Sequence, residues 1–425
     1  MKWIKNKEYY YLYKSAGAGI LLGLSRLPIS LGFLVFFGLI PLISFFNKKQ
    51  SFKKCLFAGI LFSTSYTAVS LHWISLVTIP GFIGLFILFG IYFFLLFFLI
   101  NTIWNFFPKF KYFTFISFWI SFEYLQNFGE FRFPWFNLGY SLADYLALIQ
   151  IGEIGGIYLI SILIIIVNIL IYGYKKNFGR NLTILLLIFA VWSGFGIYRL
   201  KTIKLENTNV NLSIVQVSIT QERKWDRTFL DSTCYLYEEF TKVASKNNPD
   251  LIIWPESALP VYLLKQSKYK KFVQHLAGET GIDIFAGFPH YEVAYPPHPE
   301  RYRFYNSASK FSKTGEIAKP YYKKVLVPFG ERMPFLKIFP FLWNVQMGQA
   351  NFEYGKELGF YYIKNFKFSP LICFEIAFPQ LTLQMAMEDT DFIVNITNDA
   401  WFKRSAGTYQ HAVMTKFRAI ETRKQ

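Results

Sequence analysis

Three segments far apart in the chain each place a reactive side chain beside an apolar run. Glu256 follows the run at 251–254, Lys323 precedes a second run, and Cys373 ends a third. Short apolar runs of this kind are typical of buried strands, and the end of a strand can hold a nucleophile rigidly while its face stays open. A carboxylate, an ammonium group and a thiol in such positions predict nucleophilic catalysis by Cys373.

The chemistry of a thiol explains why all three residue types would be needed. A cysteine attacks as the thiolate, which requires a base or a neighbouring cation. Glu256 is the candidate base, because it can accept the thiol proton and later return one. Lys323 can stabilise the thiolate and the oxyanion formed on attack, and the backbone N–H of residue 374 would be a second oxyanion donor. Lys324 is the alternative lysine.

These residues stand in three of four segments that together resemble the nitrilase (carbon–nitrogen hydrolase) superfamily and, more closely, the apolipoprotein N-acyltransferase family of bacterial membrane enzymes. In chain order the segments are WPES at 254–257, KKVLVPFGE at 323–331, LICFEI at 371–376 and NDAWF at 398–402. The resemblance implies that Glu256, Lys323 and Cys373 form a Glu-Lys-Cys triad. Lys323 is preferred to Lys324 because it aligns with the family's lysine.

Three further residues could support the triad: Glu331 and Trp225, which match family positions, and Glu375, which stands two residues after the nucleophile. Glu331 could orient Lys323 or assist proton transfer, and Glu375 would point the same way as Cys373 if the strand continued. Several carboxylates around one lysine would raise the pKa of at least one of them, which suits a general base. A structural ion pair is the alternative for both glutamates. Trp225 could line the path of the acyl chain or headgroup, or it could be an ordinary core or interface aromatic.

The composition indicates a membrane protein. Of the 425 residues, 53% are hydrophobic and 17% are charged, which argues against a wholly soluble chain. The formal net charge of +18 could suggest nucleic acid, but in membrane proteins excess lysine and arginine marks cytoplasmic loops. The sequence contains no RNA- or DNA-binding motif, so no nucleic-acid partner is expected.

The first 205 residues form a series of apolar segments, each near the length of about 20 residues that crosses a bilayer. The seven predicted spans lie near 10–27, 29–46, 54–76, 80–106, 110–127, 155–174 and 181–199. Basic residues cluster in alternate loops, which places the amino terminus in the cytoplasm. An odd number of spans then delivers the chain after about residue 205 to the outer side of the membrane. Residues 1–205 are therefore predicted to be a polytopic α-helical membrane domain.

Two aromatic stretches within this half also resemble family landmarks. They are His72–Ile74 and the turn-rich segment at 132–140. Such a segment could be an aromatic belt at the membrane surface, or it could serve the access of lipid to the protein.

Residues 206–425 alternate strands with helices, which predicts a layered α/β domain. The expected strands lie at 210–217, 251–254, 282–287, 304–311, 323–328, 369–373 and 391–396. The expected helices lie at 227–246, 265–281 and 379–388. Patterning alone could not separate this fold from other layered α/β folds, whereas the resemblance implies the α-β-β-α sandwich of the nitrilases.

The remaining cysteines and the histidines suggest no further site. Cys55, Cys234 and Cys373 have no metal-binding or disulfide spacing, and no pair of histidines has metal-ligand spacing, so no metal and no cofactor are expected. Cys234 is expected on a helix and far from Cys373, because a disulfide between them would disable the nucleophile in an oxidising compartment.

The resemblance implies acyl transfer in two halves. Cys373 would take an acyl chain from a membrane phospholipid as a thioester, and the α-amino group of a diacylglyceryl-cysteine apolipoprotein would then accept it. The location implied is the bacterial cytoplasmic (inner) membrane, with the catalytic domain on the periplasmic side, and a monomer is expected. A membrane-tethered carbon–nitrogen hydrolase with the same triad is the alternative, and a transporter with a degenerate domain is a second one.

The sequence departs from the family pattern at two places. The pattern normally continues well past Arg418–Glu421, so the end of the catalytic domain and an eighth span are expected to be missing from this sequence. Phe374 stands after the nucleophile, where relatives often carry tyrosine. That difference removes a hydroxyl from the site and leaves the nucleophile unchanged.

Overall fold

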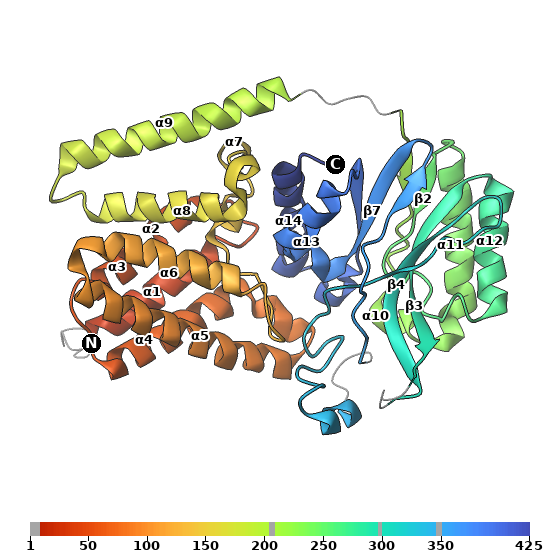
Figure 1. The fold of residues 1–425 in the computed structure, drawn as a ribbon, viewed down its shortest axis with the longest axis horizontal. Coiled ribbons are helices and arrows are strands. Elements are labelled where there is room, and N and C mark those ends of the chain that lie inside the picture. The colour runs from red at the N-terminus through yellow and green to blue at the C-terminus, as the bar shows by residue number, and fades with distance from the viewer. Residues whose placement is uncertain (1–8, 204–208, 296–299, 346–350) are drawn as a thin grey trace. The chain divides into compact units, whose positions relative to one another are not determined.

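A computed structural model describes residues 9–203, 209–295, 300–345 and 351–425 (Figure 1). The chain forms two compact units. The first comprises Met1–Lys204 and Phe402–Arg423, and the second comprises Leu205–Trp401 and Lys424–Gln425. Residues 402–423 thus group with the first unit, although the sequence-based division places them with the catalytic domain.

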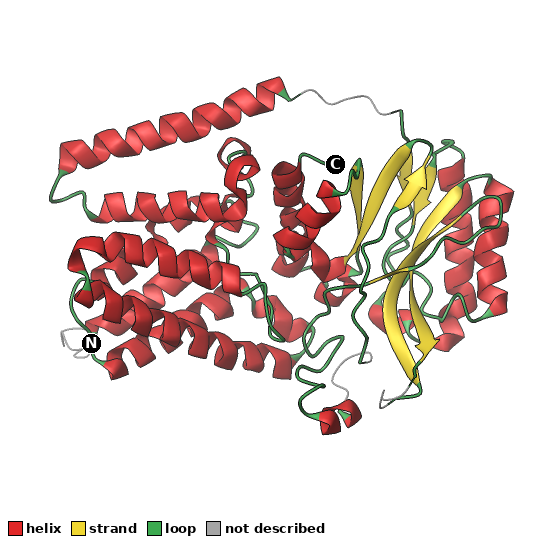
Figure 2. Ribbon diagram, viewed as in Figure 1, coloured by secondary structure: helices red, strands yellow, loops and turns green. Residues whose placement is uncertain are grey.

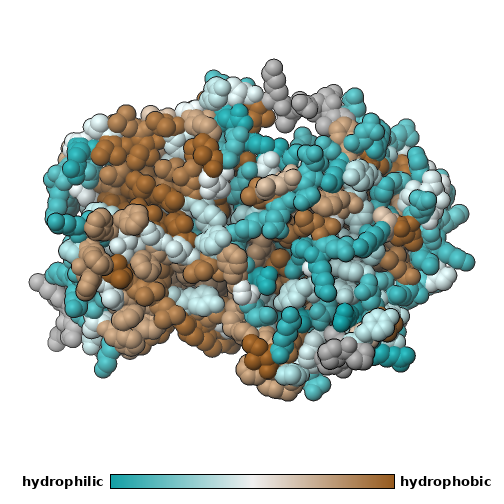
Figure 3. Space-filling model, viewed as in Figure 1, coloured by the Kyte–Doolittle hydropathy of each residue, from teal (hydrophilic) through white to brown (hydrophobic). Residues whose placement is uncertain are grey.

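The first unit is helical. Its α-helices are α1 (Tyr10–Leu24), α2 (Val35–Gly38), α3 (Ile40–Phe46), α4 (Phe52–Ser70), α5 (Ile79–Phe106), α6 (Lys111–Leu125), α7 (Leu146–Ile149), α8 (Gly152–Tyr172), α9 (Phe178–Thr202) and α14 (Ala406–Thr422). Among the described residues, α5, α8 and α9 are long and apolar enough to cross a membrane. The other predicted spans contain shorter or less apolar helices. Figure 3 shows apolar side chains gathered over the helices of this unit, as expected of a surface in contact with lipid.

The predicted span at 29–46 is interrupted between α2 and α3. The N–H of Leu39 donates to Asn168 Oδ1 at 2.9 Å, and Asn168 Nδ2 donates to the carbonyl of Val35 at 2.9 Å. The side chain of Asn168, on α8, therefore replaces the backbone hydrogen bond from the N–H of Leu39 to the carbonyl of Val35. Pro41 follows at the start of α3, where the missing N–H is tolerated.

Gln410 of α14 makes four hydrogen bonds to other segments of the first unit. Gln410 Oε1 accepts from the indole N–H groups of Trp73 at 3.1 Å and Trp135 at 2.9 Å. Gln410 Nε2 donates to the carbonyls of Ser70 and Arg26. Both tryptophans are buried, so these two aromatic landmarks form an internal anchor rather than an exposed belt.

The second unit contains two sheets (Figure 2). The first has the order β1 (Leu212–Ile214), β2 (Leu251–Ile253), β3 (Asp283–Val293), β4 (Tyr302–Phe311) and β5 (Tyr321–Tyr322). The second has the order β6 (Tyr361–Ile363), β7 (Phe366–Ile372) and β8 (Phe392–Ile396). Strands β1, β2 and β3 are parallel, as are β7 and β8. Strand β4 is antiparallel to both of its neighbours, β3 and β5, and β6 is antiparallel to β7.

Alternation along β3 shows how the layers pack. Phe285 contacts Phe368 of the second sheet with ring centroids 5.3 Å apart, so it lies between the two sheets. Its neighbours Ile284 and Ala286 point the other way, into an apolar cluster with α11 (Leu230–Ser245) and α12 (Ser267–Thr280). Helix α13 (Pro379–Met387) contacts β7. The result is the layered α/β sandwich expected from the sequence.

The strand predicted at 323–328 is wrong, because the chain leaves the sheet after β5. The N–H groups of Lys324 and Val325 donate to the carboxylate of Glu375, at 2.6 and 3.2 Å. The N–H of Val327 donates to the carboxylate of Glu331 at 2.8 Å. Glutamate side chains thus occupy the donors that a neighbouring strand would have used. The apolar run at 323–328 is therefore a loop whose backbone N–H groups donate to Glu331 and Glu375.

Candidate active site

The nucleophile candidate lies where β7 ends. Cys373 begins a 3-10 helix, Cys373–Ala377, and its φ of 52° is in the left-handed region that non-glycine residues rarely adopt. Such a conformation costs about 1–3 kcal/mol and persists only when the surroundings hold it. The N–H of Ile372 donates to Glu375 Oε2 at 2.8 Å across this turn, which is one of the contacts that hold it.

Glu256 comes from the loop after β2 and is buried with 7% exposure. Its Oε1 accepts from Asn306 Nδ2 at 2.7 Å, and its Oε2 accepts from the backbone N–H of Asn398 at 3.0 Å. A glycine on β3 permits this placement, because a Cβ at Gly287 would lie 2.8 Å from the Cα of Glu256. The first sheet, through Gly287 on β3 and Asn306 on β4, and the segment after β8 therefore both contribute to the position of this carboxylate.

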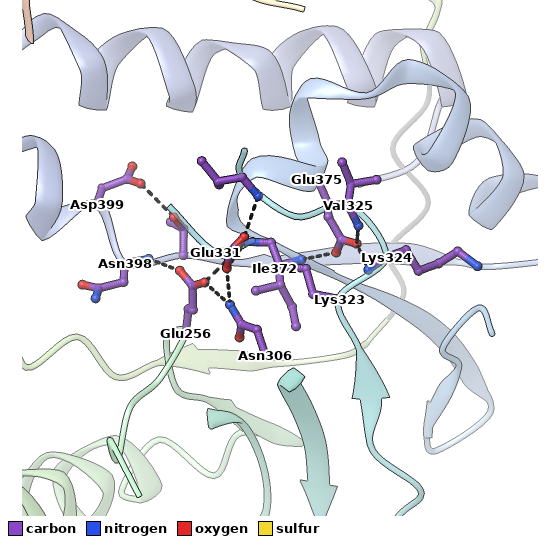
Figure 4. A network of polar contacts seen from close by, with 12 residues as sticks. Glu256, Asn306, Lys323, Lys324, Val325, Glu331, Ile372, Glu375, Asn398 and Asp399 are labelled. Carbon is purple, nitrogen blue, oxygen red and sulfur yellow. Dashed lines mark hydrogen bonds and ion pairs between the residues drawn. The ribbon is translucent and has the colours of Figure 1, made fainter. Parts of the chain in front are cut away.

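Lys323 enters the same site with a side chain that is 1% exposed. Its Nζ lies 2.9 Å from Glu331 Oε1 and 3.7 Å from Glu256 Oε1. Burial alone would lower the pKa of Lys323, but the charges of the two glutamates outweigh it and raise the pKa above its ordinary value. Lys324 points elsewhere and donates through Nζ to the carbonyl of Lys356 at 2.6 Å. The geometry thus separates the two lysines (Figure 4).

Asn306, which is not among the site residues predicted from the sequence, joins the two carboxylates of the site. Its Nδ2 lies 2.7 Å from Glu256 Oε1 and 2.8 Å from Glu331 Oε1, while its carbonyl accepts the N–H of Lys323 at 2.9 Å. Its Oδ1 is buried and has no hydrogen-bond partner among the described residues. The side chain therefore serves as a donor to two acids. A buried polar residue in the middle of a predicted strand was the signal that could have identified it.

The charges of Glu256 and Lys323 shift the pKa of the Cys373 thiol in opposite directions. Burial raises the pKa of Cys373 well above its ordinary value and the charge of Glu256 adds to this, whereas Lys323 and a hydrogen bond with Thr397 oppose it. At rest the thiol therefore keeps its proton. Attack requires that the proton move to a base, and Glu256 is the carboxylate whose charge acts on the thiol most strongly.

The two supporting glutamates have different surroundings. Glu331 pairs with Lys323 inside the site, as described above. Glu375 instead accepts hydrogen bonds from Tyr321 Oη at 2.9 Å and from three backbone N–H groups of the lysine loop and β7. The expected alignment of Glu375 with Cys373 is wrong, because the strand ends before the cysteine. Glu375 ties the loop that carries the lysine to the turn that carries the thiol (Figure 4).

Trp225 lies beside the triad segments rather than in the apolar core. It is 38% exposed, and its indole N–H donates to Gln221 Oε1 at 3.1 Å. It lines a cavity of about 510 Å³ together with Lys224, whose Nζ donates to the carbonyl of Glu256 at 3.0 Å. Cys234 lies on α11, and none of the three described cysteines, Cys55, Cys234 and Cys373, is in a disulfide.

Two family models match this chain. Residues 211–424 match the family model described as carbon–nitrogen hydrolase, and residues 18–170 match that of the apolipoprotein N-acyltransferase N-terminal domain. Among solved structures, Saccharomyces cerevisiae Nit3, a member of branch 10 of the nitrilase superfamily, is 17% identical with a TM-score of 0.38. That match covers 51% of this chain and 73% of that one. The family-model match alone shows that residues 211–424 form a carbon–nitrogen hydrolase domain.

Curated relatives with similar sequences identify the family of the whole chain. The apolipoprotein N-acyltransferase of Geobacter metallireducens is 34% identical over 315 residues, which cover 72% of this chain and 60% of that protein. The apolipoprotein N-acyltransferase of Rickettsia typhi is 33% identical over 391 residues, which cover 88% of this chain and 77% of that protein. The chain belongs to the apolipoprotein N-acyltransferase family.

Proposed function

We propose that this protein transfers an acyl chain from a membrane phospholipid to the α-amino group of a diacylglyceryl-cysteine apolipoprotein. The observation that carries the proposal is the buried cluster of Glu256, Lys323 and Glu331 beside the strained Cys373 turn. The names of the curated relatives support the same reaction.

In the first half-reaction, Glu256 takes the proton of Cys373 as the sulfur attacks the ester carbonyl carbon of the phospholipid. The ammonium group of Lys323 stabilises the oxyanion of the tetrahedral intermediate. The C–O bond of the ester then breaks, and Glu256 returns the proton to the departing lysophospholipid oxygen. The products of this half are a thioester on Cys373 and a lysophospholipid.

In the second half-reaction, the free amine of the lipoprotein attacks the thioester carbonyl. Glu256 takes a proton from the amine, the C–N bond forms, and the C–S bond breaks when the tetrahedral intermediate collapses. The proton then returns from Glu256 to the sulfur, so the enzyme is restored and an amide has formed.

The apolar helices give such a reaction a physical reason to occur at a membrane. Both substrates are lipid-anchored, and a domain fused to membrane spans meets them at a high effective concentration. We infer a multi-pass protein of the bacterial inner membrane, with the nitrilase-like domain on the periplasmic side, acting as a monomer. The alternation of basic loops in the sequence supports that orientation.

The nature of the acceptor tests the proposal. Detergent-solubilised protein is first incubated with phosphatidylethanolamine carrying a labelled acyl chain, and a synthetic diacylglyceryl-cysteine lipopeptide is then added. We expect the label to move to the lipopeptide amine in the native protein and not in Cys373→Ala. Release of the label only as free fatty acid would make the protein a hydrolase and contradict the proposal.

A further inference from the structure

A buried lysine outside the triad lines the cavity beside it. Lys224 ends α10 (Gln221–Lys224) and is 6% exposed. Its Nζ donates to the carbonyl oxygen of Glu256 at 3.0 Å, and burial lowers its pKa to about 8 against the opposing charge of Glu256. A buried ammonium group costs several kcal/mol unless an opposite charge pairs with it. A neutral carbonyl is a weak substitute for such a charge, so the lysine is suited to a bound anion.

The rest of the cavity wall favours an anion with an apolar attachment. Among the described residues that line it, Arg227 is a second cation and Asp226 is the one carboxylate. Asp226 Oδ1 already accepts from the N–H and the hydroxyl of Thr228, at 2.9 and 2.7 Å. The remaining lining residues are aromatic, apolar or uncharged, namely Trp225, Leu230, Pro260, Val261, Tyr262, Gln266, Tyr269, Pro289 and Phe352.

The cavity is also joined to the triad through the backbone. Lys224 holds the carbonyl of Glu256 itself, and the next residue, Ser257, has a φ of 48°. Phe352, on the cavity wall, donates its N–H to the carbonyl of Glu331 at 2.8 Å. A ligand in this cavity would therefore lie against the two segments that carry the carboxylates of the site.

We propose that this cavity binds the phosphate of the acyl donor, with Lys224 and Arg227 as its cationic ligands. The proposal rests on the acyl transfer proposed above and adds a specificity site to it. The phosphodiester of a phospholipid would supply Lys224 with an anionic hydrogen-bond partner in addition to the carbonyl of Glu256, and the aromatic and apolar wall suits the glycerol and the start of the acyl chains. Donor recognition would then depend on phosphate in addition to the acyl ester.

The test compares two donors that differ in the phosphate headgroup. The rate of Cys373 acylation is measured against donor concentration in detergent micelles containing either phosphatidylethanolamine or diacylglycerol with the same acyl chains. We expect Lys224→Met to lower kcat/KM for the phospholipid about tenfold more than for diacylglycerol, as loss of a hydrogen bond to a charged group predicts. An equal loss for both donors would mean that Lys224 only positions Glu256, and would overturn the proposal. Lys268→Met is the matched control, because that lysine is exposed and pairs with Asp231.

A binding measurement separates this proposal from the proposed reaction. Cys373→Ala protein is titrated by calorimetry with a short-chain phosphatidylethanolamine, with and without Lys224→Met. Weaker binding in the double variant supports the phosphate site. If the native protein is not acylated by any donor, the proposed reaction is refuted, but this binding result still supports the site. Equal binding by both proteins refutes the site. Inorganic phosphate should compete with the lipid in a manner that depends on Lys224, and phosphate binding without competition would overturn the assignment to the donor.

Discussion

Asn306 offers a sharp test of how the site is assembled. Replacing it with leucine keeps most of the side-chain volume but removes the donor shared by Glu256 and Glu331, at 2.7 and 2.8 Å. A hydrogen bond to a charged group contributes about 1.5–3 kcal/mol, and about 1.4 kcal/mol corresponds to a factor of ten in rate. If the bond to Glu256 fixes the base for proton transfer, Asn306→Leu should slow acylation of Cys373 by about 10- to 100-fold.

The assay is single-turnover acylation of Cys373 at saturating donor, so that a change in donor binding does not enter the rate. Ser309→Ala is the control, because Ser309 lies on the same strand and donates to the carbonyl of Ala318 at 2.6 Å, away from the carboxylates. Both variants lose buried hydrogen bonds and should unfold at lower temperature, but only Asn306→Leu should lose the acylation rate. A native rate in Asn306→Leu would refute the view that this amide positions the base.

Three further predictions concern the residues around the triad. Lys323→Met should abolish acylation of Cys373, whereas Lys324→Met should stay within a few-fold of the native rate. The reason is that the Lys324 side chain donates to the carbonyl of Lys356 and not to a residue of the site. Equal effects of the two substitutions would contradict the assignment of Lys323 as the lysine of the site. Gly287→Ala should move the backbone of Glu256, since the added Cβ would lie 2.8 Å from its Cα, and should lower the acylation rate in a protein that still folds by circular dichroism. The KM for a phospholipid donor should rise as pH increases through about 8, where Lys224 loses its proton, while the KM for diacylglycerol changes less; a flat profile for both donors would argue against the phosphate site.

Local sequence patterns predicted the strands that precede Glu256 and Cys373. The apolar run before Cys373 is β7, and the run before Glu256 is β2, because buried strands of an α/β sandwich need such runs. The helices at 230–245 and 267–280 follow from their amphipathic spacing. In these elements the local preference of the chain and the demands of the fold agree.

The loops of the site could not be predicted in the same way. The apolar run after Lys323 resembles a strand, but its N–H groups donate to Glu331 and Glu375, one of which comes from far along the chain. The direction of Glu375 depends on the left-handed turn at Cys373, which no periodicity records. Asn306 can donate to Glu256 only because the fold places β4 beside the loop after β2. Such contacts arise from the tertiary fold, so they are not encoded in any single segment.

The proposed acyl transfer depends above all on a covalent intermediate at Cys373. The most direct measurement is peptide mass spectrometry of the native protein after brief exposure to phosphatidylethanolamine with a labelled acyl chain. We predict the mass of one acyl group on the peptide that carries Cys373, sensitive to hydroxylamine as a thioester is, and much reduced in Glu256→Gln. An acyl group on another residue, or transfer of the label to a lipopeptide by Cys373→Ala protein, would contradict the proposed role of Cys373.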